Sequence, residues 1–315
     1  MNASPATTAL PDGALRLADW GLIRATGADA RNFLHGQLTQ DVLHLPDGQA
    51  RLAGYCSAKG RLMASFVVWP TAADELLLAC SADLLPATLK RLSMFVLRAK
   101  CKLGDASGEL ALWGAAGPSA AALTGGMTPW QQRADGARQL IRLPDARLDG
   151  HNVARALLVA PLAEPAPALP ALDAGAWAAL EVRSGVARVV AATAEQFVPQ
   201  MVNLELVGGV NFQKGCYPGQ EVVARSQYRG TLKRRAYLLT GAAPMTPGQE
   251  IFHSADAGQP AGMVALAGTL GDGRHDALAE LKIAAATEGS LHLGGAEGPR
   301  LSLGTLPYAV PLETA

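Results

Sequence analysis

The stretch from Pro161 to Ala176, PLAEPAPALPALDAGA, constrains the fold of this chain more than any other feature. It holds four prolines and shows neither helical nor strand periodicity. Proline fixes φ and removes a backbone donor, so such a stretch cannot continue a helix or a central strand. We therefore predict an extended connector between two lobes at residues 161–176. The length of 315 residues agrees, because about 150 residues per domain implies two domains or three small ones.

The composition is that of a compact globular protein with many loops. Hydrophobic residues make up 49% and charged residues 17%, with 34 glycines and 20 prolines, which excludes a disordered chain. The 27 lysines and arginines balance 27 aspartates and glutamates. A neutral surface has no field to gather nucleic acid or anionic lipid, so direct nucleic-acid binding and membrane binding are not expected. Any anion site must be local.

The first residues and the cysteines bear on the compartment. The opening stretch MNASPATTALPDGAL has no cation and no apolar run, so it predicts neither a signal peptide nor a transit peptide. Residues 1–14 are expected to be a disordered tail, and no apolar stretch is long enough to span a bilayer. The four cysteines form no C-x-x-C pair, and the histidines lie at no metal-ligand spacing from them. We expect a cytoplasmic protein with free thiols and no metal site.

Hydrophobic patterns predict an α+β protein with an all-β end. Short strand-like runs punctuated by glycine follow residue 235, and they indicate a small all-β domain over 236–315 behind α+β lobes over 15–235. The expected strands are Trp20–Ala25, two runs within Ala50–Trp69, and Glu75–Cys80, and the expected helices are Asp29–Leu38, Asp83–Arg98 and Trp177–Gly185.

The loop Asn211–Glu221, NFQKGCYPGQE, gathers a cation, a thiol, a phenol and a carboxylate within a few residues. Its segment Tyr217-Pro-Gly-Gln220 fits a type II turn, in which glycine takes the positive φ that follows proline. A helix is expected to start near Gly219, so its N-terminus and the charge of Lys214 would both favour the thiolate of Cys216. An ordinary turn with a half-buried thiol fits the same spacing.

A run of five cations follows this loop: Arg225, Arg229, Lys233, Arg234 and Arg235. Such a run is usually a solvated surface. Beside a reactive loop in a protein without net charge, it is also a candidate site for a ligand rich in carboxylates or phosphates. A multiply carboxylated tail and an RNA backbone both meet that description.

Lys214-Gly-Cys-Tyr-Pro-Gly-Gln-Glu221 resembles the K-G-C-Y-x-G-Q-E signature of the YgfZ family, bacterial folate-binding proteins involved in iron-sulfur cluster maintenance. The similar segments run in order from about residue 15 to the C-terminus, and the stretch Leu103–Pro170 contributes least. They also include Asp19–Ala30, Phe33–Asp41, Cys56–Arg61, Phe197–Asn203, Ala224-Arg225, Tyr228–Gly230, Lys233–Arg235 and Leu306–Tyr308.

The resemblance implies a fold and a ligand. The fold would be a three-domain ring related to the T-protein of the glycine cleavage system, with two interleaved α+β lobes, a C-terminal β-barrel and tetrahydrofolate near the central opening. Glu181 matches the glutamate of an L-E-x-x-x-G pattern that hydrogen-bonds the pterin, although by itself it would pass for an exposed helix glutamate. Tyr217 would contact the folate, and Arg225, Arg229 and Lys233 would meet a polyglutamate tail.

The resemblance also implies a task and limits it. Cys216 and Lys214 would serve iron-sulfur client proteins, with indirect effects on tRNA modification. The T-protein relatives use an acidic residue from a Gly-Gly-x-x-Asp-Asp pattern, and Ala64 and Ser65 stand at its acidic positions here. Neither can carry a carboxylate's charge, so a functional aminomethyltransferase is not expected. A one-carbon transferase with another acid-base residue, and an RNA-binding or scaffold protein, are the alternatives.

Overall fold

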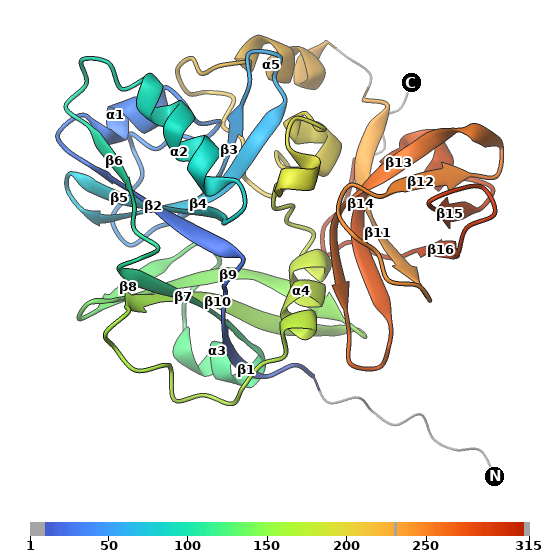
Figure 1. Cartoon of the computed structure of the whole chain (residues 1–315), viewed down its shortest axis with the longest axis horizontal. Coiled ribbons are helices and arrows are strands. Elements are labelled where there is room, and N and C mark those ends of the chain that lie inside the picture. Colours follow the sequence, from blue (N-terminus) through green and yellow to red (C-terminus); the bar gives the residue numbers. More distant parts are fainter. Residues whose placement is uncertain (1–9, 230–231, 312–315) are drawn as a thin grey trace.

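The computed structural model describes residues 10–229 and 232–311, which form two five-stranded antiparallel sheets and a closed six-stranded barrel (Figure 1). Of the predicted disordered tail, residues 1–14, the first nine residues lie outside the described part of the chain. The last two residues of this tail belong to strand β1 (Gly13–Arg16), where Gly13 and Ala14 are buried, so the prediction of disorder is wrong there. Within the described part, no helix is long and apolar enough to cross a membrane.

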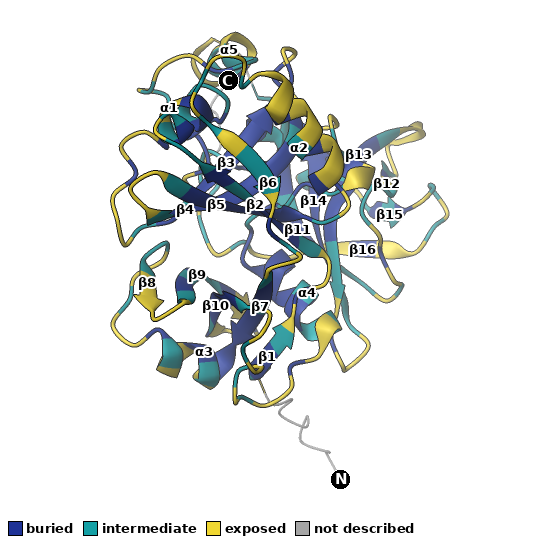
Figure 2. Ribbon diagram, turned by 60° about the vertical axis from the view of Figure 1, so that its left-hand side comes forward, coloured by how far each residue is buried: buried dark blue, intermediate teal, exposed yellow. Residues whose placement is uncertain are grey.

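The first sheet follows the order β3-β4-β5-β2-β6. Its outer helix α2 is shorter than predicted, because the backbone leaves the helix after Met94 and Leu97 takes a φ of 46°. Phe95, directly after the helix, is 43% exposed. Figure 2 shows that much of the surface of α2 is exposed. The elements are β2 (Trp20–Thr26), α1 (Ala30–His35), β3 (Arg51–Cys56), β4 (Leu62–Ala72), β5 (Glu75–Ser81), α2 (Leu85–Met94) and β6 (Lys102–Asp105).

The second sheet follows the order β1-β7-β10-β9-β8. Along the chain, one of its strands comes before the first sheet and the other four come after it. Strand β1 precedes the first sheet along the chain but pairs with β7, which comes after it, and Gly13 lies opposite Ala116. The two α+β lobes are therefore interleaved, as predicted. The remaining elements are β7 (Leu110–Ala116), α3 (Gly117–Leu123), β8 (Gln132–Asp135), β9 (Arg138–Leu148) and β10 (His151–Pro161).

The proline-rich stretch is irregular between β10 and helix α4 (Ala174–Arg183). The helix begins three residues before the predicted Trp177, because the Asp173 carboxylate accepts a hydrogen bond from the Ala176 N–H and caps it. The chain then returns to the first lobe through two 3₁₀ turns, η1 (Ala191–Thr193) and η2 (Pro199–Val202), and helix α5 (Gln220–Tyr228).

The C-terminal barrel closes in the order β11-β14-β13-β12-β15-β16. Helix α4 lies against it so closely that a Cβ on Gly268 would meet the Ala179 nitrogen at 2.2 Å. A buried ion pair between Arg183 and Asp276 joins the same two elements. The strands are β11 (Arg234–Gly241), β12 (Glu250–His253), β13 (Asp256–Thr269), β14 (His275–Lys282), β15 (Leu291–Leu293) and β16 (Arg300–Leu303), with a 3₁₀ turn, η3 (Ile283–Ala286).

A single apolar core connects the first lobe to the barrel. Side chains of β4 such as Phe66 share it with Phe197 and Leu204 from the returning segment, and with Leu238 and Leu278 from the barrel. A second core, centred on Trp69 and Trp177, lies between the two sheets and α4. Because α4 contributes to both interfaces, it is the element around which the three parts of the molecule meet.

Candidate functional site

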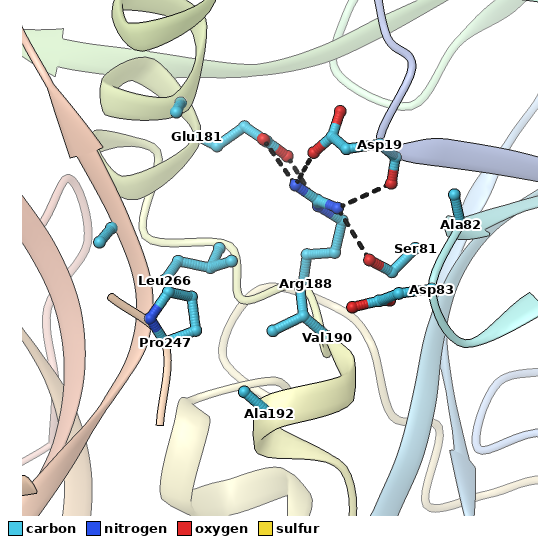
Figure 3. Close-up of a pocket in the computed structure, with 12 residues that line it drawn as sticks. Asp19, Ser81, Ala82, Asp83, Glu181, Arg188, Val190, Ala192, Pro247 and Leu266 are labelled. Atoms are coloured by element: carbon cyan, nitrogen blue, oxygen red, sulfur yellow. Dashed lines mark hydrogen bonds and ion pairs between the residues drawn. The ribbon is translucent and has the colours of Figure 1, made fainter. Parts of the chain in front are cut away.

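A cavity of about 540 Å³ opens where the first sheet, α4 and the barrel meet (Figure 3). The barrel side is apolar, with Pro247 and Leu266. The opposite side carries the polar groups, and these come from the start of β2, the end of β5, helix α4 and the segment after it: Asp19, Ser81, Asp83, Glu181 and Arg188. A polar wall facing an apolar wall is typical of sites for small organic ligands.

Glu181 lies on α4 with only 7% of its surface exposed. Its neighbours Leu180 and Trp177 anchor the helix in the core between the sheets, and this placement turns the carboxylate toward the cavity. The possibility that Glu181 is an exposed helix residue is therefore wrong. The sequence singled out the residue from a family pattern, and the structure brings it to the wall of the cavity.

Arg188 is the partner of Glu181, and sequence reasoning missed it. Its Nε lies 3.2 Å from Oε1 and its Nη2 3.2 Å from Oε2, while Nη2 is also 2.6 Å from Oδ2 of Asp19. Nη1 donates to the Ser81 hydroxyl at 3.0 Å, and the guanidinium lies 4.8 Å from the Trp20 ring. Burial opposes the charged form, but the charges of Glu181 and Asp19 outweigh it and raise the pKa of Arg188.

The cysteine loop lies apart from this cavity, on the first lobe. Gly219 has a φ of 79°, and the Gln220 N–H donates to the Tyr217 carbonyl at 3.2 Å, which confirms the predicted turn. A Cβ on Gly219 would meet the Ser57 carbonyl oxygen at 2.3 Å, so the turn sits directly on the β3–β4 hairpin. Helix α5 begins at Gln220, and Cys216 is exposed with a free thiol.

Lys214 has a different environment from the one predicted. Its ammonium donates to the backbone carbonyls of His35 and of Leu38, the latter at 2.9 Å, and lies 4.8 Å from the Tyr217 ring. Burial lowers the pKa of Lys214 to about 8, opposed by the charges of Asp41 and Cys216. The side chain thus ties the loop to the end of α1, in addition to placing a charge near Cys216.

Tyr217 and the surroundings of the loop also depart from the expected site. Tyr217 is 6% exposed, burial raises its pKa, and it does not line the central cavity. His35 lies on the other side of the loop, with its Nδ1 3.0 Å from the Asp41 carboxylate and its Nε2 beside Gly215. His44 binds the second oxygen of Asp41 at 3.0 Å. Only the fold reveals this pair of histidines.

The run of five cations divides into two groups. Arg234 pairs with Glu280 at 2.7 Å, and the buried Arg235 pairs with Glu205. Both arginines therefore already form ion pairs within the protein. The exposed side chains are Arg225, Arg229 and Lys233. Two of these, Arg225 and Lys233, line a separate open cavity of about 440 Å³ next to α5.

The positions that correspond to the T-protein acids are buried on β4. Ala64 is fully buried, and the Ser65 hydroxyl accepts a hydrogen bond from the Val189 N–H at 2.9 Å. Ser65 therefore holds the segment that carries Arg188, which is a structural task. In the part of the chain that the structure describes, no three His, Cys, Asp or Glu side chains are grouped so as to hold a metal ion.

The fold defines the class of protein. The solved aminomethyltransferase T of the glycine cleavage system from Bartonella henselae superimposes with a TM-score of 0.71, over 95% of this chain and 87% of that one, at 16% identity. The three-part T-protein architecture expected from the sequence is thereby confirmed.

The sequence relatives define the family. The tRNA-modifying protein YgfZ of Edwardsiella ictaluri is 32% identical over 95% of this chain and 93% of its own, and that of Sodalis glossinidius is 30% identical over 96% and 94%. No family model matches the chain. On the strength of these full-length relatives, the chain belongs to the YgfZ family.

Proposed function

We propose that this protein binds a reduced folate in the central cavity and supports iron-sulfur proteins, and through them tRNA modification. The observation that carries the proposal is the buried Glu181 on the wall of that cavity. Two findings support it: the T-protein fold and the relatives named as tRNA-modifying proteins. In this proposal the effect on tRNA is indirect, in keeping with the neutral charge of the chain.

The cavity fits a folate in size and in chemistry. Its volume of about 540 Å³ falls within the roughly 300–1,000 Å³ usual for small-ligand sites. Each oxygen of the Glu181 carboxylate accepts one bond from Arg188, which leaves lone pairs for N–H donors on a pterin. Leu266 and Val190 would cover an aromatic ring. A bound tetrahydrofolate supplies ring nitrogens that carry one-carbon units, and the residues named here would orient it.

Calorimetric titration with tetrahydrofolate tests the binding. Glu181→Gln keeps the shape but removes the charge that holds Arg188 and accepts from the pterin, so we expect at least a tenfold loss of affinity, equivalent to about 1.4 kcal/mol. Glu297→Gln, on the exposed surface of the barrel, is the matched control and should bind like wild type. Equal affinity of all three proteins would contradict a pterin site at Glu181.

We further propose that Cys216 is the functional thiol and is dispensable for folate affinity. Neither Cys216 nor its anchor Lys214 is among the residues that line the cavity, and Lys214 is bonded to the segment after α1, so a thiol there adds nothing to pterin binding. In cells that lack the endogenous protein, Cys216→Ala should fail to restore iron-sulfur enzyme activity while binding tetrahydrofolate normally. Cys101→Ala is the control. Full restoration by Cys216→Ala would make the residue a structural part of the turn.

For the exposed cations we propose contact with the polyglutamate tail. Neutralising Arg229 and Lys233 should weaken triglutamyl folate more than monoglutamyl folate, and the difference should shrink at high salt because these side chains are exposed. Lys90→Gln on α2 serves as an exposed control. An equal loss of affinity for both ligands would show that the polyglutamate tail does not contact these side chains. Steeply salt-dependent RNA binding that the same changes abolish would instead favour the RNA-binding alternative.

A one-carbon transferase is the second candidate. Ala64 and Ser65 replace the acids of the T-protein pattern, but two other carboxylates, those of Asp19 and Asp83, line the cavity. Asp19 faces Arg188, and Asp83 accepts a hydrogen bond from the Ala191 N–H at 2.9 Å. Either can act as an acid or base in principle. Repeated turnover of a one-carbon folate that Asp83→Asn or Asp19→Asn abolishes would support this function. Binding without turnover supports the leading proposal.

A further inference from the structure

Arg155 is a buried cation without an ionic partner. It lies on β10 with 3% of its surface exposed, on the same face of the strand as the core residues Leu157 and Val159. Its side chain donates a single hydrogen bond among the described residues, from Nε to the Pro144 carbonyl at 3.2 Å, and none of their carboxylates lies within 4.0 Å of it. Its guanidinium carbon also lies 5.5 Å from the centre of the Trp177 ring. A buried charge with only these contacts and no counter-charge is costly unless something else binds it.

Arg155 lines a small second cavity of about 40 Å³, which shares Glu181 and Arg188 with the central cavity. Aromatic walls surround it, among them Trp20, whose indole N–H has no hydrogen-bond partner among the described residues, and Trp130. A water needs roughly 10–15 Å³ of such space, so the cavity accepts only a few atoms at the edge of a ligand, not a ring.

Arg155 and Glu181 both line this small cavity and have opposite hydrogen-bonding capacity. Arg155 can only donate, and the Glu181 carboxylate that pairs with Arg188 can only accept. A ligand that satisfies both presents a carbonyl oxygen beside N–H groups, which is the edge of a cyclic amide. Burial lowers the pKa of Arg155 to about 10, opposed by the charge of Glu181, so the side chain remains a cation at neutral pH.

We propose that Arg155 is a specificity residue that donates to the ring carbonyl oxygen of the pterin while Glu181 accepts from the neighbouring N–H groups. This inference rests on the proposed folate binding and adds the orientation of the ring, with its amide edge in the small cavity and the remainder in the central one. It also explains why a charged residue stands in an otherwise apolar row of β10.

The test is a pair of ligands: tetrahydrofolate and its 4-amino analogue, in which an amino group replaces the ring carbonyl oxygen and the adjacent ring nitrogen loses its hydrogen. A donor would then face a donor, so wild type should bind tetrahydrofolate about tenfold to one-hundredfold more tightly than the analogue. Arg155→Met should lose the share of this preference that depends on the carbonyl oxygen and keep the share that depends on the ring N–H and Glu181, and Arg155→Lys should lose less than Arg155→Met. Arg147→Met, an exposed arginine of the same sheet, should retain the whole preference.

The outcomes separate the two proposals. If wild type binds both ligands equally, the role of Arg155 is refuted while folate binding stands, and this result needs no variant that folds. A preference unchanged in Arg155→Met, or an equal loss of both ligands in it, also refutes the role. If tetrahydrofolate does not bind wild type at all, the proposed function fails and this inference falls with it.

Discussion

The ion pair between Arg183 and Asp276 joins α4 to the barrel, and its removal should have a large effect on stability. Nε of Arg183 lies 2.5 Å from Oδ2 of Asp276, and Nη2 lies 2.9 Å from Oδ1, in a bidentate arrangement. Asp276 is fully buried, and 10% of the Arg183 side chain is exposed. Asp276→Ala would therefore leave a buried guanidinium without a counter-charge.

From this geometry we expect Asp276→Ala to lower the free energy of unfolding by about 3–5 kcal/mol, since that is the usual cost of breaking a buried pair on one side. The double variant Arg183→Met with Asp276→Leu removes both charges and fills the space with apolar atoms. It should recover most of the loss, because well-packed apolar replacements of a buried pair are often neutral or stabilising.

Urea unfolding followed by circular dichroism measures both quantities, and folate titration of the same proteins reports the effect on the cavity. Glu181 lies two residues before Arg183 on α4, so the single variant should also bind tetrahydrofolate more weakly. A loss below about 1 kcal/mol for Asp276→Ala would refute the reasoning, since an unpaired buried charge costs more than that. A double variant no more stable than the single one would refute it as well.

Three further predictions concern the cysteine loop. Gly219→Ala should destabilise the protein by about 1–3 kcal/mol in urea unfolding, because its positive φ and the close carbonyl leave no room for a Cβ. Cys216 should be alkylated first by limiting iodoacetamide, since it alone of the described cysteines is exposed, and Cys101 second, with the two buried thiols last. Stability contributed by Lys214 should rise between about pH 8 and pH 10.5, because the folded chain releases that proton at lower pH than the unfolded chain.

Each of these has a control or a contrary result. Gly271→Ala introduces a methyl group into open space without a positive φ and should be near neutral. Mass spectrometry that finds Cys216 among the slowest thiols would contradict its exposure. Urea unfolding of wild type and Lys214→Met at pH 7.5 and pH 10 isolates the lysine, and a difference that does not move in favour of wild type at the higher pH would contradict its lowered pKa.

Local chemistry was readable from the sequence. The turn at Pro218-Gly219 followed from the φ preferences of two residues, and the start of α5 followed from the turn. The end of α2 was not predictable, because Phe95 and Val96 continue the apolar pattern while the backbone leaves the helix. The spacing of apolar residues indicates which side chains favour burial. It does not show where the helix ends, because tertiary packing decides that.

Long-range pairing was hidden from the sequence. Arg234 and Arg235 look like Lys233 in the sequence, yet each of the first two meets a glutamate from a distant segment. Arg188 and Arg155 lie in ordinary apolar surroundings along the chain and acquire meaning only when the fold brings them to Glu181. Residues that are neighbours in the sequence therefore predicted the turn of the cysteine loop, whereas Glu181 was the one cavity residue that the sequence analysis proposed as a ligand contact.

The interleaving of the two sheets also governs the order in which the molecule can assemble during its synthesis. After β1, the ribosome synthesises all strands of the first sheet before it reaches β7, with which β1 pairs. Gly13 therefore cannot pair with Ala116 until the intervening residues have been made. Pairings this distant along the chain form slowly, because closing the intervening loop costs entropy before any contact repays it. The first sheet is one continuous stretch of chain, from Trp20 to Asp105, inserted into the second sheet, so the second sheet cannot be excised as one continuous fragment.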